Sequence, residues 1–216
     1  MEFDTLIRGR RSIRKYKPEP VPHELIREIL DEGRWSPSWA NTQAWNIYVV
    51  TGETLERLRG ARKDPTQSQD QTSPDFRVPQ EWPPHLAERT KQLLDCLKPD
   101  APGNAPAPAP TALTKFFGAP CLLLFAVERG VTADYALFDS GLIVQSVCLA
   151  AHNKGLGTCI MAMAGRDPDT LREILPGAAD MQFVIGVALG YPDEEATINR
   201  FERSRVPLEE LVSWAE

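Results

Sequence analysis

The chain has 216 residues and a mass of 24.1 kDa, which is enough for one large domain with its own hydrophobic core. Apolar residues make up 42% of the sequence, so disorder along the whole chain is excluded. The formal net charge of −6 disfavours general nucleic-acid binding, and the sequence lacks an apolar run of about 18 residues that would span a membrane. The N-terminus starts acidic and then turns basic, unlike a signal peptide, so a cytoplasmic protein is expected.

The first half of the chain predicts short elements separated by proline-bearing connections. Apolar spacing and helix-ending residues predict a helix over 2–9, a helix from Glu24 to near Gly33, a strand over 46–52 and a polar helix over 55–63. Residues 64–84 carry no period and predict a loop, whereas 85–97 predict a helix. The alternating Ala/Pro stretch at 98–110 predicts a solvated linker or a mobile loop.

The second half is more regular. Its apolar runs predict a strand over 121–127, a helix over 134–154, a glycine turn and short strand over 155–165, a short helix over 168–175, a strand over 181–192 and a terminal helix over 208–215. The helix at 134–154 is apolar nearly all round, so it is expected in a large core or a subunit interface. Interleaved helices and strands predict an α+β domain with a central sheet.

The sequence gives little support for a metal site or for a catalytic cysteine. The four cysteines form no C-x-x-C pair and predict free, mostly buried thiols: Cys96, Cys121, Cys148 and Cys159. Three scattered histidines show no zinc spacing, so no metal is expected. Neither a Cys–His nor a Ser–His nucleophile has a local motif.

Two groups of arginines lie at opposite ends of this acidic chain. The first consists of Arg10, Arg11, Ser12 and Arg14, and the second of Arg200, Arg203, Ser204 and Arg205. Guanidinium groups this close repel one another unless an anion lies between them, and their forked donors match phosphate oxygens. If the two groups converge, they form a site for a phosphate monoester. The alternatives are a solvated basic loop and an exposed tail.

Two further segments could approach a flat ligand. The loop at 36–50 places Ser38, Asn41 and Gln43 among three tryptophans, and amide side chains can read the edge of a heterocycle. The alternative is a helix-ending turn whose polar side chains satisfy local backbone groups. GLGTCIMAMAG at 155–165 offers close backbone approach to a ligand, or simply a tight turn into a core strand.

Four motifs in order resemble the FMN-dependent nitroreductase family: R-R-S-x-R, S-P-S-x-x-N-x-Q-x-W, G-L-G-T-C and R-S-R-x-P. The resemblance runs from residue 3 to about 214 and is weakest over 61–115. It implies a single nitroreductase-like domain over 1–216 with a variable loop or lid at about 61–115. It also implies a mostly antiparallel central sheet flanked by helices, and a homodimer with FMN at an interface formed by the 134–154 helix.

The resemblance assigns roles position by position. The family positions that serve the phosphate and ribityl end of FMN are matched by Arg10, Arg11 and Ser12. The position near the pyrimidine edge of the flavin is matched by Arg14. The C-terminal phosphate-binding pair is matched by Arg203 and Arg205. The loop that reaches the flavin from the other subunit is matched by Pro37, Ser38, Asn41 and Gln43. The strand end along the isoalloxazine ring is matched by Ile160, Met161, Ala162 and Met163. Some relatives have other residues at the positions of Ile160 and Ala162, which affects the shape of the substrate pocket.

The activity implied is hydride transfer from NAD(P)H through flavin N5 to a nitroaromatic or quinone-type acceptor, by a ping-pong mechanism. Trp39, Phe116 and Phe117 are hypothesised as pocket walls. One alternative is another flavin reaction on the same fold: reductive dehalogenation, heterocycle oxidation or consumption of the flavin. A second is a non-enzymatic protein that stores or senses FMN.

Overall fold

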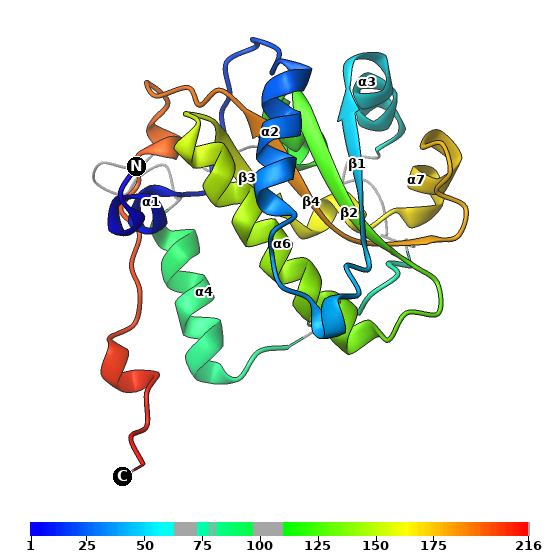
Figure 1. Ribbon diagram of the computed structural model, residues 1–216. Helices are drawn as coiled ribbons and strands as arrows, with labels where there is room; N and C mark the ends of the chain where they lie inside the picture. The colour runs from blue at the N-terminus through cyan, green and yellow to red at the C-terminus, as the bar shows by residue number, and fades with distance from the viewer. Residues whose placement is uncertain (63–72, 78, 80, 97–109, 216) are drawn as a thin grey trace.

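A computed structural model describes residues 1–62, 73–77, 79, 81–96 and 110–215. At its centre is a four-stranded sheet in which every neighbouring pair is antiparallel, in the order β1, β2, β4, β3 (Figure 1). The strands are β1 (Trp45–Thr51), β2 (Cys121–Glu128), β3 (Gly157–Met161) and β4 (Met181–Gly190). The expected α+β fold with a central antiparallel sheet is confirmed.

Helices and short 3₁₀ turns surround this sheet. The helices are α1 (Phe3–Gly9), α2 (His23–Gly33), α3 (Gly52–Ala61), α4 (Pro84–Cys96), α5 (Pro110–Thr114), α6 (Ala133–Asn153) and α7 (Pro168–Ile174). All of these except α5 lie where the sequence predicts a helix. Most of the predicted loop at 64–84 and nearly all of the predicted linker at 98–110 lie outside the described residues.

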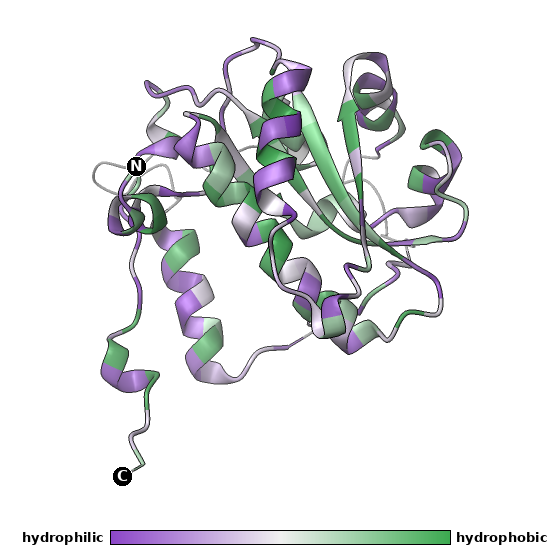
Figure 2. Ribbon diagram, in the orientation of Figure 1, coloured by the Kyte–Doolittle hydropathy of each residue, from purple (hydrophilic) through white to green (hydrophobic). Residues whose placement is uncertain are grey.

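Strand β2 divides the hydrophobic core into two layers. Successive side chains on a strand point to opposite faces, and every residue of β2 from Cys121 to Val127 is buried. Leu123 and Phe125 pack with α2 and α6 on one face. Leu122 and Leu124 pack with α3 and α7 on the other. Figure 2 shows these central strands as hydrophobic, whereas α2 and α4 carry both hydrophobic and hydrophilic stretches.

Helix α6 runs the length of the sheet, and its two ends differ. Ile143, Val147 and Ala151 are fully buried against the sheet and α2. At the N-terminal end, Tyr135, Leu137 and Phe138 are exposed. The expected burial in a core is therefore confirmed for the C-terminal two thirds of the helix. No helix in the described part of the chain is long and apolar enough to cross a membrane.

The prediction of a terminal helix over 208–215 is wrong. Only one 3₁₀ turn forms, at Leu208–Glu210, and the tail runs away from the sheet beside α4 (Figure 1). Its large apolar side chains are exposed: Leu208, Leu211, Val212 and Trp214. A helix this short needs a surface on which to pack its apolar face, and the tail finds none within the described chain.

Three cysteines are buried as free thiols, as expected. Burial raises the pKa of Cys121 to about 12 and that of Cys148 to about 11, so both remain protonated at neutral pH. Burial also raises the pKa of Cys159. These thiols are core residues, not nucleophiles. The side chain of Cys96 lies outside the described residues.

Candidate functional site

The segment after α1 lies along the ends of β3 and β4. The backbone of Ser12 pairs with Thr158, and the N–H of Ile13 donates to the Thr158 carbonyl at 2.8 Å. Farther along, Tyr16 is buried and its hydroxyl donates to the carbonyl of Ala188 at 3.2 Å. These contacts fix the R-R-S-x-R motif beside the G-L-G-T-C motif, although the two lie far apart in the sequence.

Asn199 joins this segment to the C-terminal part of the chain. Its side-chain oxygen accepts from the N–H of Arg14 at 2.8 Å, and its amide nitrogen donates to the carbonyls of Lys15 and Asp193, both at 2.8 Å. Only 5% of the residue is exposed. Sequence reasoning missed Asn199, because an asparagine among arginines carries no local signal of such a long-range role.

The two arginine groups converge on one groove of about 790 Å³. The members of the two motifs that line it are Arg10, Ser12, Arg14, Arg203, Ser204 and Arg205. Residues of α4 and the tail complete the wall, including His85, Glu88, Arg89, Phe201, Glu202 and Glu210. The convergence on which the predicted phosphate site depends is therefore present. We call this cavity the arginine groove.

Positive charge in the arginine groove is only partly compensated. The Arg203 guanidinium donates to the carbonyls of Arg8 and Arg10. Burial, together with the guanidinium groups of Arg11, Arg10 and Arg205, lowers the pKa of Arg203 below its ordinary value. The Arg10 side chain has no hydrogen bond or ion pair to any residue that the structure describes. Such a cluster favours a bound anion.

Arg11 does not share this groove. Its guanidinium donates to the carbonyl of Asn199 at 2.9 Å, and the side chain lines a separate crevice of about 240 Å³ with His152. Arg10 lines both this crevice and the arginine groove, whereas Arg11 lines the crevice and not the groove. The bond to Asn199 lets Arg11 brace the segment, and the phosphate contact that the resemblance implies for Arg11 stays a prediction.

His152 gives a pH prediction for the apoprotein. Burial, with the charges of Arg10, Arg203 and Arg11, lowers the pKa of His152 below its ordinary value. The unfolded chain therefore binds this proton more readily than the folded chain. The free energy of unfolding should fall as the pH drops below about 6.5 and level off below the folded pKa.

Urea denaturation between about pH 5 and 7.5 tests this pH dependence. The wild type should lose more stability than His152→Gln across this window, because only the wild type carries the titrating imidazole. Equal pH slopes for the two proteins would contradict the prediction.

The S-P-S-x-x-N-x-Q loop lies at the N-terminal end of α6. The N–H of Trp39 donates to both carboxylate oxygens of buried Asp139 at 3.1 Å, and the N–H of Gln43 donates to the Ser38 hydroxyl at 3.0 Å. Left-handed backbone occurs at Ala40 and at two predicted site residues, Asn41 (φ 57°) and Gln43 (φ 48°). Non-glycine residues hold this conformation only where surrounding contacts enforce it, which often marks a functional site.

This loop and the arginine groove do not meet within one chain. The loop contacts Asp139 on α6, whereas Gly9, next to the arginine segment, lies against His152 near the other end of that helix (Figure 1). Asp139 and His152 are 13 positions apart on this helix, about 20 Å at a rise of 1.5 Å per residue. Pro37, Ser38, Asn41 and Gln43 therefore lie far from the arginine segment within one chain.

The predicted strand end is partly accessible. Ile160 and Ala162 are exposed and line a second groove of about 410 Å³ beside α6, whereas Met161 is buried in the core. The carbonyls of Met163 and Ala164 accept from the guanidinium of Arg62. Arg62 thus holds the turn that follows β3, and it is a second residue that sequence reasoning missed. Its signal is weak, because Arg62 ends a polar helix without any motif.

The three aromatic residues proposed as pocket walls have different environments. Trp39 is 58% exposed, and its ring centroid lies 5.3 Å from that of Tyr135. Phe116 and Phe117 are only 1% and 7% exposed and pack in the core. Both have left-handed backbone in a 3₁₀ turn. Their burial in the core does not support the predicted role as pocket walls.

Comparisons with known proteins agree with the ordered motifs. The sequence model of the Nitroreductase family matches residues 7–191. A 4-nitrobenzoate reductase of Pseudomonas putida is 33% identical over 213 residues, covering 94% of this chain and 91% of that protein. A chloronitrobenzene nitroreductase of Comamonas testosteroni is 32% identical, with 98% and 96% covered.

Solved structures share the fold. The FMN-dependent nitroreductase NfnB from Mycobacterium smegmatis, solved in complex with NADPH, superposes with a TM-score of 0.87 at 27% identity, covering 99% of this chain and 97% of that one. An FMN- and NADPH-dependent nitroreductase NfnB from a Sphigopyxis strain gives 0.86 at 25% identity, with 100% of both chains covered. The chain therefore belongs to the nitroreductase family, as its motifs predict.

Proposed function

We propose that this chain is an FMN-dependent oxidoreductase that uses NAD(P)H to reduce a nitroaromatic or quinone-type acceptor by a ping-pong mechanism. The observation that carries the proposal is the convergence of two distant arginine segments on one groove. Two relatives at 33% and 32% identity are named for the reduction of nitroaromatic compounds, which supports the same class of acceptor here. When bound, FMN supplies the hydride and electron transfer for which the side chains have no group of their own.

The arginine groove fits the phosphate end of FMN. Arg10, Arg203 and Arg205 offer forked donors to a dianion, and Ser12 and Ser204 add hydroxyl groups. Burial and the neighbouring guanidinium groups lower the pKa of Arg203, and a bound phosphate would relieve the repulsion among those groups. These five residues are the proposed phosphate contacts.

Arg14 is the proposed electrostatic residue at the pyrimidine edge. Its N–H is held by Asn199 and its guanidinium lies 5.5 Å from the centroid of the Phe201 ring, so both ends of the residue are positioned. A fixed cation at this edge stabilises negative charge that develops there during reduction. The exposed residues Ile160 and Ala162 are proposed to lie along the ring.

The functional unit is proposed to be a homodimer that shares its two sites. The second chain would bring its own 37–43 loop to the arginine groove of the first, since the loop of the same chain lies about 20 Å away along α6. Exposed Tyr135 and Phe138 offer an apolar surface for that contact. The exposed tail residues, such as Trp214, would be covered in the same assembly.

An anaerobic absorption spectrum tests the proposed function. The purified protein should show flavin bands, and these should bleach when NADH or NADPH is added and return when a nitroaromatic acceptor follows. A yellow protein that never bleaches would favour another flavin reaction or FMN storage. A colourless protein that does not take up added FMN would refute the proposal.

A further inference from the structure

The second groove, of about 410 Å³, is built where β3 ends. Strand β3 pairs with β4 only as far as Gly186, and the next residues of β4, from Phe183 to Ile185, line the groove. We call it the acceptor groove. The other lining residues used below are Phe76, Arg77, Leu137, Ser140, Val144 and Ile160.

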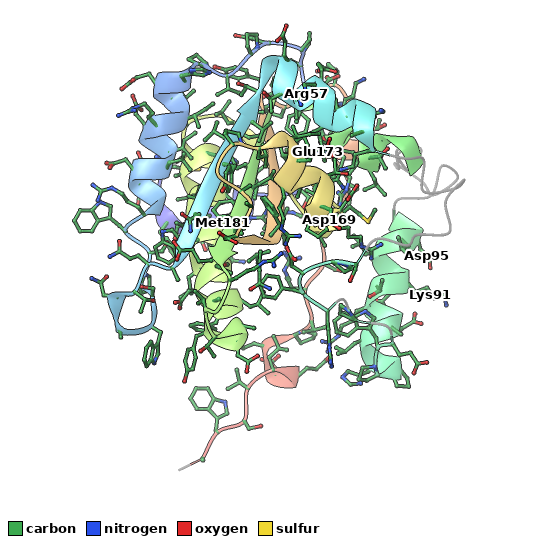
Figure 3. All side chains as sticks on the ribbon, turned by 90° about the vertical axis from the view of Figure 1, so that its right-hand side faces the viewer. Arg57, Lys91, Asp95, Asp169, Glu173 and Met181 are labelled. Carbon is green, nitrogen blue, oxygen red and sulfur yellow. The ribbon has the colours of Figure 1, made fainter. Side chains whose placement is uncertain are left out.

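A buried ion pair fixes one wall of the acceptor groove. One carboxylate oxygen of Asp75 pairs with Arg172, and the other accepts from the N–H of Phe183 at 2.8 Å. The two side chains are only 11% and 14% exposed. Arg172 also donates to the Met181 carbonyl and to Asp169, and Figure 3 labels these two residues on this side of the molecule. Asp75 thereby holds the next two residues, Phe76 and Arg77, at the groove.

The chemistry of the acceptor groove suits an aromatic ring with a charged substituent. Leu137, Val144 and Ile160 give it apolar walls. Within them, the hydroxyl of Ser140 is buried, with the residue 2% exposed, and has no hydrogen-bond partner among the described residues. This hydroxyl is too enclosed to contact a ligand in the groove, so the apolar walls are the feature that suits an aromatic ring.

Two arginines line the groove, and Arg77 supplies the charge for this proposal because Arg166 already interacts with another group. The side chain of Arg77 is exposed at the groove and makes no hydrogen bond or ion pair to the described part of the chain. The neighbouring carboxylate of Asp75 is fully engaged with Arg172 and Phe183, so it does not neutralise Arg77. A free guanidinium held above an apolar cavity is suited to bidentate binding of a carboxylate.

We propose that Arg77 selects acceptors that carry a carboxylate on the aromatic ring, with the ring lying between Phe76 and the α6 wall. The proposal rests on the proposed function, because Ile160 and Ala162 are the residues expected along the flavin and also line this groove. The apolar walls of the groove favour an aromatic ring over the phosphates of a nicotinamide nucleotide. Asp75 and Arg172 are positioning residues for Arg77.

Equilibrium binding to the FMN-loaded protein provides the test, with benzoate and its neutral counterpart benzamide as probes. The wild type should bind benzoate about tenfold more tightly than benzamide by titration calorimetry, as expected for a charge-assisted pair. Arg77→Gln should abolish this preference and leave benzamide affinity unchanged. Arg57→Gln on α3, an exposed arginine outside the groove (Figure 3), is the matched control and should retain the preference.

Either of two binding results would overturn the proposal: equal affinities in the wild type, or a preference that survives Arg77→Gln. The anion that Arg77 binds could be the carboxylate of an acceptor or a phosphate of NADPH. Kinetics with 4-nitrobenzoate and 4-nitrobenzamide distinguish these two sources. A higher KM for NADPH in Arg77→Gln, with an unchanged ratio between the two acceptors, would assign Arg77 to a nucleotide phosphate and refute the acceptor role. The binding test and the activity test are independent, because calorimetry requires no turnover. If the wild type does not oxidise NADPH, the proposed function is refuted, and the benzoate preference still decides the role of Arg77.

Discussion

Replacing Asn199 by alanine should both destabilise the fold and weaken FMN binding. The change removes the acceptor for the Arg14 N–H and the donor for the carbonyls of Lys15 and Asp193, all at a buried position. Unsatisfied buried groups of this kind cost about 1–3 kcal/mol each, so the total loss is on the order of 3 kcal/mol. Urea denaturation measures the loss of stability, and fluorescence titration measures FMN affinity, which should fall at least about tenfold.

The matched control is Asn153→Ala. The side chain of Asn153 is exposed, and its oxygen accepts only from the N-terminal amine among the bonds that the structure describes. This variant should unfold within about 0.5 kcal/mol of the wild type and bind FMN normally. An Asn199→Ala protein with wild-type stability and wild-type FMN affinity would show that the two arginine segments are held together by other contacts.

Elements with a strong hydrophobic pattern were the most predictable part of this molecule. The apolar run of β2 and the amphipathic spacing of α2 each specify an element and its buried side chains. The order of the strands could not be predicted from these patterns. It depends on contacts between residues far apart in the sequence, because β4 lies between β2 and β3.

The failed predictions share a physical cause, which is that local sequence does not determine what a segment packs against. The tail has helical apolar spacing, yet a short helix needs a partner surface. Phe116 and Phe117 are predicted to line a pocket, but both side chains are buried in the core. Asn199 and Asp75 bond to residues far away in the sequence, so neither leaves a pattern in its own neighbourhood.

The arginine site was easier to predict from the sequence, because charge alone points to it. Like charges gathered at two ends of an acidic chain require compensation, and a shared anion is one solution. The resemblance then assigned the individual positions, and the structure brings Arg10, Ser12, Arg203 and Arg205 into one groove. Arg11 instead lines the neighbouring crevice, which it shares with Arg10.

Heterodimers that carry two defects should distinguish shared sites from sites within one chain. One defect is Arg203→Met, which removes a proposed phosphate contact. The other is the double change Asn41→Ala and Gln43→Ala, which removes both amides and leaves alanine in left-handed backbone. Each homodimer should lose most FMN binding and NADPH-dependent reduction.

The arrangement of the two defects decides the result. When the two defects are on different chains, one shared site contains both defects and the other contains neither. About half of the wild-type activity per dimer should then remain. With both defects on one chain and a wild-type partner, each shared site contains one defect, and activity should be lost. Sites confined to single chains would give the opposite pattern: activity would be lost in the first heterodimer, and about half would remain in the second.

The measurement uses differently tagged chains, which are purified as heterodimers and assayed for bound FMN and for NADPH oxidation. The opposite pattern would mean that the loop crosses the approximately 20 Å between Asp139 and His152 within its own chain, against the anchoring of Trp39 by Asp139.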